Sequence, residues 1–344
     1  IKLFLHKKKH KMFFKQNINL LNRFHFKNST LYKKILKFKN FNYKKNYELS
    51  EMPFLPVRLF KEFDMLSIDK KKIFKTLNSS GTSGQKRSKI YLDKFNSSNQ
   101  VKALQKIVSN IVGKERLPML IIDRDIKHKE RYEFNARIAA VNGFSIFGKD
   151  HTFVLDRNKN LDYKVLNSFL KKYNNKRFLI FGFTSFIFQY LINRLDKKKI
   201  NFDFSNAILI HGGGWKKLEK LKISNKKFKT ELKNKINLTR VHNYYGLVEQ
   251  TGSIFLECKC GYLVTSEFSD VIIRDENFNI LKKNQTGFIQ LFSLLPTSYP
   301  GHNILTEDIG KIVDNNGCNC SLTGKKFLVE GRVEAAEIRG CSDI

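Results

Sequence analysis

A short segment rich in serine, threonine and glycine has the residue types that bind phosphate groups. It reads Ser79-Ser80-Gly81-Thr82-Ser83-Gly84 and is followed by Gln85 and Lys86. Glycine lets the backbone approach an anion closely, hydroxyl groups add hydrogen-bond donors, and lysine supplies a cation. The glycine spacing differs from that of the G-x-x-x-x-G-K-[ST] phosphate loop. By itself, the segment is equally typical of a flexible hairpin loop.

Two later segments have residues suited to an adenine base. Gly212 to Gly214 follow an apolar run that ends at Ile210, and their small size would let the backbone approach a flat ligand. Tyr245 could stack on a base, and Gly246 beside it favours a turn. Both segments therefore predict nucleotide contacts at the ends of core elements.

Three charged residues could complete a nucleotide site. Glu249 is a carboxylate of the kind that holds Mg²⁺ beside phosphates. Asp308 is expected on a turn, where both of its oxygens could accept hydrogen bonds from ribose hydroxyls, and Arg332 supplies a permanent cation. Each segment alone is explained equally well by a solvated loop, but the ordered set favours an enzyme that uses a nucleotide.

The ordered set of motifs resembles the adenylate-forming superfamily, and specifically the acyl-protein synthetases of the LuxE type. The resemblance covers the chain from about residue 51 to the end. The residues that carry it are Ser79-Ser80-Gly81-Thr82-Ser83-Gly84, His211-Gly212-Gly213-Gly214-Trp215-Lys216, Tyr245-Gly246-Leu247-Val248-Glu249-Gln250-Thr251-Gly252-Ser253, Ser298-Tyr299-Pro300-Gly301-His302, Leu305-Thr306-Glu307-Asp308, Gly331-Arg332 and Ala336-Glu337-Ile338-Arg339-Gly340-Cys341-Ser342.

This resemblance implies that the protein activates a long-chain fatty acid with ATP and Mg²⁺. The carboxylate would attack the α-phosphate to give acyl-AMP and pyrophosphate, and a protein thiol would then take the acyl group as a thioester. An acyl-protein reductase or an acyl carrier is the implied partner. By resemblance, Ser79 to Gly84 and Lys86 lie on the phosphates, Gly212 to Gly214 near adenine with Tyr245 and Gly246, Glu249 on Mg²⁺, Asp308 on the ribose and Arg332 at the hinge beside the nucleotide.

Three departures from the wider superfamily qualify the resemblance. Gln85 stands directly before Lys86, where many relatives have a proline, and Val248 stands where a threonine commonly precedes the magnesium-binding glutamate. The chain is also expected to lack the full mobile C-terminal domain, which carries a second catalytic lysine in larger members. This favours the LuxE type over ordinary acyl-CoA ligases.

The cysteines suggest two further roles. The resemblance makes Cys341, near the end of the chain, the expected acyl acceptor, and the neighbouring Arg339 would lower the pKa of its thiol. An incidental tail cysteine is the alternative. Two Cys-x-Cys pairs, Cys258 with Cys260 and Cys318 with Cys320, could bind a structural Zn²⁺, although free buried thiols remain an equal alternative.

Around these motifs, short apolar runs alternate with helix-length segments, which predicts an α/β fold. The expected architecture is the large domain of adenylate-forming enzymes, with mostly parallel sheets flanked by helices and a small antiparallel C-terminal subdomain. The predicted parallel strands are 119–123, 178–181 and 207–210, the later strands 271–273, 288–292 and 327–329, and the helices 97–112, 130–141, 163–173 and 185–195. In the helix 97–112, Val101, Leu104, Ile107, Val108 and Ile111 are expected to form one buried face.

Composition sets broad limits on the protein. The 344 residues include 64 Lys and Arg against 31 Asp and Glu, and 41% are hydrophobic, so a large core is expected. Residues 1–50 are expected to form a basic, solvated and loosely helical or disordered N-terminal extension, and contact with polyanions or a membrane is the alternative. Residues 51–344 are expected to form the acyl-protein synthetase domain. With no apolar stretch long enough for a membrane helix and few cysteines, a cytoplasmic location is expected.

Two other functions remain open. The acyl group could pass to coenzyme A or to an acyl-carrier protein, which the labelled product would distinguish. A basic non-enzymatic module that binds polyanions is the hypothesis from another class, and it predicts binding that weakens steeply with salt and no AMP production. No specific nucleic-acid partner is expected, because outside the basic N-terminal extension the lysines are scattered through the chain rather than concentrated on one element.

Overall fold

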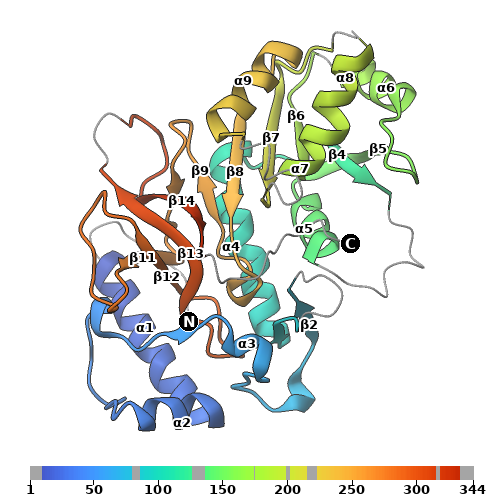
Figure 1. The fold of residues 1–344 in the computed structure, drawn as a ribbon. Coiled ribbons are helices and arrows are strands. Elements are labelled where there is room, and N and C mark those ends of the chain that lie inside the picture. The colour runs from blue at the N-terminus through green and yellow to red at the C-terminus, as the bar shows by residue number, and fades with distance from the viewer. Residues whose placement is uncertain are drawn as a thin grey trace.

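A large mixed sheet organises the molecule (Figure 1). The computed structural model describes residues 10–79, 86–125, 136–173, 175–198, 202–214, 223–314 and 318–333. Within these ranges the sheet has 12 strands in the order β11-β12-β13-β14-β10-β9-β8-β7-β6-β4-β5, and β1 (Leu55–Pro56) pairs with β13. A separate hairpin of β2 (Lys75–Asn78) and β3 (Lys89–Leu92) brackets the segment expected to bind phosphate.

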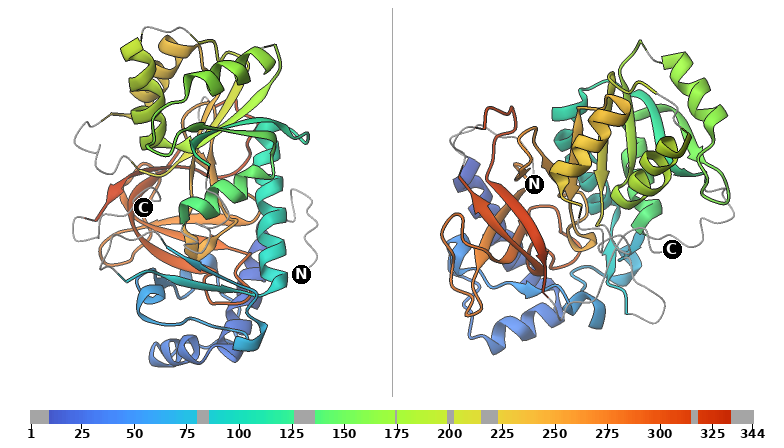
Figure 2. Two further views of the ribbon diagram at one scale, coloured as in Figure 1. Left: turned by 90° about the vertical axis from the view of Figure 1, so that its right-hand side faces the viewer. Right: turned by 45° about the horizontal axis from the view of Figure 1, so that its top comes forward.

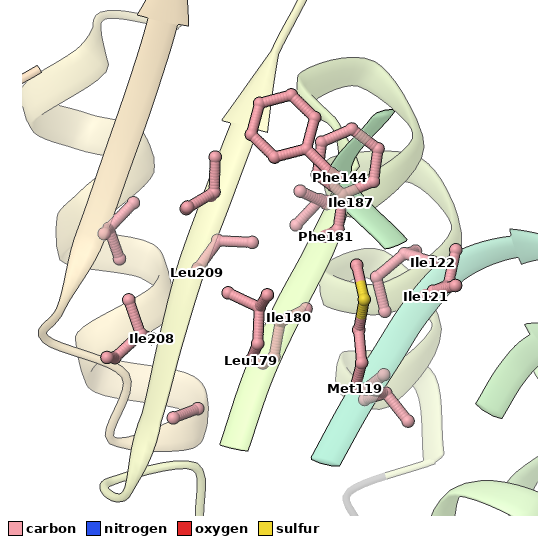
Figure 3. Close-up of a cluster of buried hydrophobic side chains, with 14 of the residues drawn as sticks. Met119, Ile121, Ile122, Phe144, Leu179, Ile180, Phe181, Ile187, Ile208 and Leu209 are labelled. Atoms are coloured by element: carbon pink, nitrogen blue, oxygen red, sulfur yellow. The ribbon is translucent and has the colours of Figure 1, made fainter. Parts of the chain in front are cut away.

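The parallel half of the sheet holds the largest part of the core. All residues of β6 and β7 are buried, because helices cover both faces of these strands (Figures 1 and 2). Figure 3 shows side chains of β4, β6 and β7, such as Met119, Leu179 and Leu209, packed side by side in this core. The parallel strands are β4 (Leu117–Arg124), β5 (Gly148–Leu155), β6 (Phe178–Phe183), β7 (Ala207–Gly212) and β8 (Val241–Tyr245).

The other half of the sheet is antiparallel and continues directly from β8. The structure thus confirms the expected fold class, with the antiparallel strands joined to the parallel ones edge to edge in one sheet. The strands are β9 (Phe255–Glu257), β10 (Leu263–Val264), β11 (Ser269–Arg274), β12 (Gly287–Ser293), β13 (Asn303–Val313) and β14 (Lys326–Arg332).

The predicted helices are present: α6 has the predicted limits, the limits of the others differ, and residues 130–135 of the predicted helix 130–141 lie outside the described residues. One detail of the prediction is wrong: in α4 the buried side is formed by Ala103, Ile107, Val108 and Val112, whereas Val101 is 44% exposed. The helices are α1 (His10–Asn28), α2 (Thr30–Phe38), α3 (Leu59–Glu62), α4 (Lys94–Val112), α5 (Ala136–Ser145), α6 (Tyr163–Tyr173), α7 (Thr184–Phe186), α8 (Asn193–Lys198) and α9 (Asn225–Ile236), and a π-helical turn, Ile187–Ile192, joins α7 to α8.

The N-terminal segment differs from the expected solvated extension. Residues 10–38 form α1 and α2, which pack against the antiparallel half of the sheet and the β2–β3 hairpin. Ile18 and Leu21 of α1 lie in one core with Phe292 of β12, and Leu36 of α2 lies in another with Leu77 of β2. The N-terminal segment is therefore packed onto the rest of the fold, and the domain boundary near residue 51 stays a prediction.

The helices of the described ranges are all too short or too polar to cross a lipid bilayer.

Candidate functional site

The carboxyl ends of β7 and β8 carry two of the predicted nucleotide segments. The register of the parallel pair places Gly212 opposite Tyr244, so Tyr245 lies one residue further along the same edge of the sheet. Ligands of open α/β sheets bind at this edge. The Tyr245 hydroxyl donates to Oδ2 of Asp308 over 2.5 Å, which joins the edge to β13.

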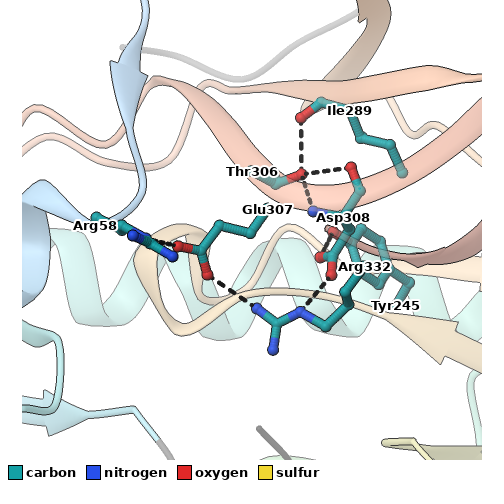
Figure 4. A network of polar contacts seen from close by, with 7 residues as sticks. All are labelled: Arg58, Tyr245, Ile289, Thr306, Glu307, Asp308 and Arg332. Atoms are coloured by element: carbon teal, nitrogen blue, oxygen red, sulfur yellow. Dashed lines mark hydrogen bonds and ion pairs between the residues drawn. The ribbon is translucent and has the colours of Figure 1, made fainter. Parts of the chain in front are cut away.

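Asp308 lies inside a strand, and its expected position on a turn is wrong. It is paired with Arg332 across β13 and β14, next to an irregularity in the register. Arg332 Nε lies 3.1 Å from Oδ1 of Asp308, and Arg332 Nη2 lies 3.2 Å from Oε2 of Glu307. Glu307 also pairs with Arg58, and Figure 4 shows the four charged side chains in one row with Tyr245.

Burial controls the protonation of this network. It raises the pKa of Asp308, while the hydrogen bond from Tyr245 and the charge of Arg332 act to lower it. Burial and the Asp308 charge hold the pKa of Tyr245 well above its usual value, so its hydroxyl stays a donor. A carboxylate offers about four acceptor positions. Tyr245 and Arg332 use two of them, which leaves acceptor capacity for ribose hydroxyls.

Glu249 lies in a short 3-10 turn, Val248–Gln250, and is almost completely buried. Its Oε1 has no hydrogen-bond partner among the described residues. Burial raises the pKa of this carboxyl group, and the nearby Ser88 hydroxyl partly offsets the effect. A buried carboxylate oxygen without a partner is costly unless a cation or a donor completes it. This feature fits the predicted Mg²⁺ ligand.

Neighbouring side chains fix the position of Glu249. Gln250 Nε2 donates to the backbone oxygens of Leu291 and Gly301, at 3.1 and 2.9 Å. A Cβ at Gly301 would lie only 2.6 Å from the backbone oxygen of Glu249 and would also strike the Tyr299 ring. Glycine at position 301 therefore lets the predicted Ser298–His302 motif pack directly against the turn that carries Glu249.

The three glycines after β7 have different reasons to be glycine. A Cβ at Gly212 would strike the ring of Tyr244, and Gly213 has a φ of +78°. Among the described residues, which leave out 215–222, no atom lies within 4 Å of a Cβ placed at Gly214. The predicted adenine contact of these glycines stays a prediction. Trp215, after these glycines, lies outside the described residues.

His211, before the glycines, is held as a neutral ring. Its Nδ1 lies 2.8 Å from the Thr184 hydroxyl, and burial lowers its pKa to about 3. The Nε2 atom is buried without a hydrogen-bond partner in the part of the chain that the structure describes.

The predicted phosphate segment is described only at its ends. Ser79 and Ser88 are joined by two hydrogen bonds, Ser79 N to Ser88 O at 3.0 Å and Ser88 N to Ser79 Oγ at 2.8 Å. Ser80, Gly81, Thr82, Ser83, Gly84 and Gln85 lie outside the described residues. The exposed Lys86 ammonium is 2.5 Å from Oε2 of Glu62, so its predicted contact with phosphate stays a prediction.

A family model matches the chain over residues 3–344, and its description is acyl-protein synthetase, LuxE. The chain belongs to the LuxE family. The match includes α1 and α2, so it begins well before the resemblance found in the motifs. No curated protein sequence matches the chain.

Solved structures share the fold of this LuxE-family chain. An open conformation of 2-hydroxyisobutyryl-CoA ligase in complex with 2-HIB-AMP and CoA has a TM-score of 0.73 and 13% identity, and the match covers 94% of this chain and 75% of the ligase. ATP-bound MatB from Rhodopseudomonas palustris has a TM-score of 0.50 and 15% identity, with 78% of this chain and 50% of MatB covered. At these identities the likeness shows a shared adenylate-forming fold.

Three of the four cysteines predicted to bind zinc lie together. The Sγ atoms of Cys258, Cys260 and Cys318 are all within 4.8 Å of one another, whereas Cys320 is outside this group and its thiol lies 3.5 Å from the Leu322 oxygen. Burial raises the pKa of Cys258 to about 12. At Cys318 burial acts in the same direction, but hydrogen bonds with Cys260 and its other neighbours outweigh it and lower the pKa to about 6.

An ion pair at the end of β4 was missed in the sequence. Arg137 Nη1 of α5 lies 3.3 Å from Oδ1 of Asp123, and both side chains are buried. Asp123 Oδ2 and Arg137 Nε have no hydrogen-bond partner among the residues with described positions. The sequence signal that could have revealed this pair is an acidic residue at the end of a continuous apolar strand, because such strands end where α/β sheets bind ligands.

Proposed function

We propose that this protein activates a long-chain fatty acid as acyl-AMP and transfers the acyl group to a protein thiol. The observation that carries the proposal is the meeting of Tyr245, Asp308 and Arg332 beside the glycine edge of β7. The buried Glu249 oxygen without a partner supports a metal ligand in the same fold. Membership of the LuxE family supports acyl transfer to protein.

The residues of the site would act mainly by holding the substrates. Asp308, kept in place by Tyr245 and Arg332, would accept hydrogen bonds from the ribose, and Gly214 would leave room for the base. Glu249 would hold Mg²⁺, which neutralises phosphate charge when bound. Phosphoryl chemistry gains most of its acceleration from alignment and charge neutralisation, and this arrangement of residues is suited to both.

The proposed reaction has two steps. A carboxylate oxygen of the acid bonds to the α-phosphorus of ATP, and pyrophosphate leaves with the electrons of the broken P–O bond. The thiolate of Cys341 then attacks the carbonyl carbon, so that AMP leaves and a thioester remains. Cys341 lies outside the described residues, and its role rests on the resemblance alone. An acyl-protein reductase or an acyl carrier would receive the acyl group.

An ATP–pyrophosphate exchange assay across a panel of carboxylic acids tests the first step. We expect exchange with long-chain acids and its loss in Glu249→Gln. Glu276→Gln is the matched control, because Glu276 is exposed on a turn. Folded protein that neither exchanges pyrophosphate with any acid nor binds ATP would refute adenylation, and exchange with short acids alone would refute the long-chain assignment.

Covalent labelling tests the second step. Wild-type protein incubated with ATP and radiolabelled fatty acid should carry hydroxylamine-sensitive label, and Cys341→Ser should carry none while exchange continues. Label that persists in Cys341→Ser contradicts the assigned acceptor. The fold is shared with a CoA ligase, which makes transfer to coenzyme A or a carrier protein the second candidate. Formation of acyl-CoA in place of labelled protein would favour it.

We also propose a structural Zn²⁺ on the cysteine group. Tetrahedral zinc with Zn–S bonds of about 2.3 Å separates its sulfurs by about 3.8 Å. Cys258 Sγ and Cys318 Sγ are 3.8 Å apart, and the lowered pKa of Cys318 favours a thiolate. Cys260 would supply a third ligand. Metal analysis tests the site, and less than about half an equivalent of zinc in protein purified without chelators would contradict it.

The cytoplasmic location expected from the sequence stays a prediction.

A further inference from the structure

Positive charge is concentrated at the N-terminal end of the chain. Residues 1–47 contain 14 of the 64 Lys and Arg residues and none of the 31 Asp and Glu residues. The rest of the chain is basic, but its lysines are mixed with acids. This contrast marks one part of the protein as a candidate surface for an anionic partner.

Large apolar side chains are exposed in the same part of the fold. Phe38, at the end of α2, is 89% exposed and Phe74 is 58% exposed. Of the ten exposed large hydrophobic residues in the described ranges, seven lie between residues 12 and 95. They are Met12, Leu20, Phe24, Phe38, Phe63, Phe74 and Phe95. Three of them, Phe38, Phe63 and Phe74, lie on segments that also carry exposed lysines, and exposed apolar side chains of this size are typical of a surface that meets a partner.

One core brings these segments to the same end of the molecule. Leu36 of α2, Phe60 of α3, Leu77 of β2 and Leu92 of β3 belong to a single buried cluster. Residues 10–75, in blue, form the lower end of the molecule in Figure 1 and in the left view of Figure 2. We call the exposed side of α2 and of residues 59–75 the basic end. Its exposed lysines are Lys33, Lys34, Lys37, Lys70, Lys71 and Lys72.

The acids of the basic end are engaged by the protein. Asp69 caps the turn Lys70–Lys72 by accepting from Lys71 N, and Asp64 accepts from the Tyr91 hydroxyl. Glu62 pairs with Lys86. Six exposed lysines against these three exposed acids leave the basic end with a net positive charge.

We propose that the basic end docks on an anionic membrane surface. Lysines near anionic lipid headgroups each attract the surface, and phenylalanine side chains enter the headgroup region. A nucleic acid fits less well. The exposed cations of the basic end are lysines, whereas arginine is the residue suited to bidentate recognition of nucleic-acid phosphates.

Vesicle co-sedimentation of the full chain tests the proposal. Wild-type protein should bind vesicles of phosphatidylcholine with phosphatidylglycerol, and should not bind phosphatidylcholine alone. The triple variant Lys33→Gln, Lys34→Gln and Lys37→Gln should lower the partition coefficient by on the order of 100-fold. The single variant Phe38→Ser should lower it several-fold, because this side chain is almost fully exposed and its loss leaves the fold unchanged.

A matched control separates local docking from net charge. Lys226, Lys227 and Lys233 are exposed on α9, at the opposite end of the molecule in Figure 1. The same three-lysine change made there should leave the partition coefficient within about threefold of wild type. Equal losses from α2 and α9, binding that ignores lipid charge, or tighter binding to a single-stranded oligonucleotide than to the vesicles would each overturn the proposal.

Discussion

Replacement of Asp308 by asparagine tests the proposed nucleotide site most directly. The change keeps the size of the side chain but removes the charge and replaces one acceptor oxygen by an amide donor. In the folded protein the carboxylate accepts from Tyr245 over 2.5 Å and faces Arg332 at 3.1 Å. The single side-chain oxygen of asparagine could accept a hydrogen bond from at most one of these two partners. Its amide group, a donor, would face the other partner or the ribose.

The expected loss follows from the strength of a charge-assisted hydrogen bond. Such a bond to a carboxylate contributes about 1.5 to 3 kcal/mol, so removing one to the ribose should weaken ATP binding roughly 10- to 150-fold. The affinity for the acid substrate should change little, because Asp308 is proposed to touch only the nucleotide. Titration calorimetry with ATP measures the first effect, and the KM for the acid in pyrophosphate exchange measures the second.

Glu307→Gln provides the matched control for this experiment. Glu307 is the neighbour of Asp308 on β13 and pairs with the same arginine, Arg332, as well as with Arg58. Its loss removes a similar charge without removing the proposed ribose acceptor, so ATP binding should stay within about threefold of wild type. The reasoning fails if Asp308→Asn, with an unfolding midpoint near that of wild type, binds ATP as tightly as the control.

Three further predictions concern protonation and packing. Burial holds the pKa of Glu249 above its usual value, so Mg²⁺ affinity in exchange assays should rise with pH until that pKa is passed; a pH-independent affinity would contradict the metal ligand. Gly301→Ala should reduce the free energy of unfolding by about 1–3 kcal/mol in urea titrations, while Gly331→Ala, which has no atom of the described residues within 4 Å of the added Cβ, should not; equal effects would contradict the packing argument. Buried histidines with lowered pKa values bind protons mainly in the unfolded protein. The free energy of unfolding should therefore fall below pH 6.5, by up to about 1.4 kcal/mol per pH unit for each such histidine. A free energy of unfolding that stays constant down to about pH 5 would argue against neutral buried rings. These histidines are His25, His211 and His302.

The parallel strands were predictable because their environment is uniform. A strand covered by helices on both faces must be apolar at every position, and β4, β6 and β7 show this as continuous runs. The strand β5 lies at the edge of the sheet and is polar along half its length, so its pattern was missed. The strand β13 was missed for another reason. Its Thr306, Glu307 and Asp308 are polar residues whose partners come from other elements.

The N-terminal helices were underestimated because polar side chains form part of their packed side. Asn19 of α1 bonds to the backbone of Tyr47, and His25 bonds to Ser67 and to the oxygen of Pro296. His25 also stacks on His302 at 4.9 Å, beside the Gly301 loop. A hydrophobic pattern cannot reveal a face whose polar groups are satisfied by residues far away in the chain.

The amino-acid sequence by itself determined the chemical groups, their order along the chain and the apolar strands that support them, because these depend on residue type and local periodicity. Only the tertiary structure decided which groups meet. Tyr245, Asp308 and Arg332 come together through strand register across the sheet, and Glu249 is left with a buried oxygen and a raised pKa by the packing of distant loops. Distances and burial of this kind arise from contacts between residues far apart in the chain, which no local pattern records.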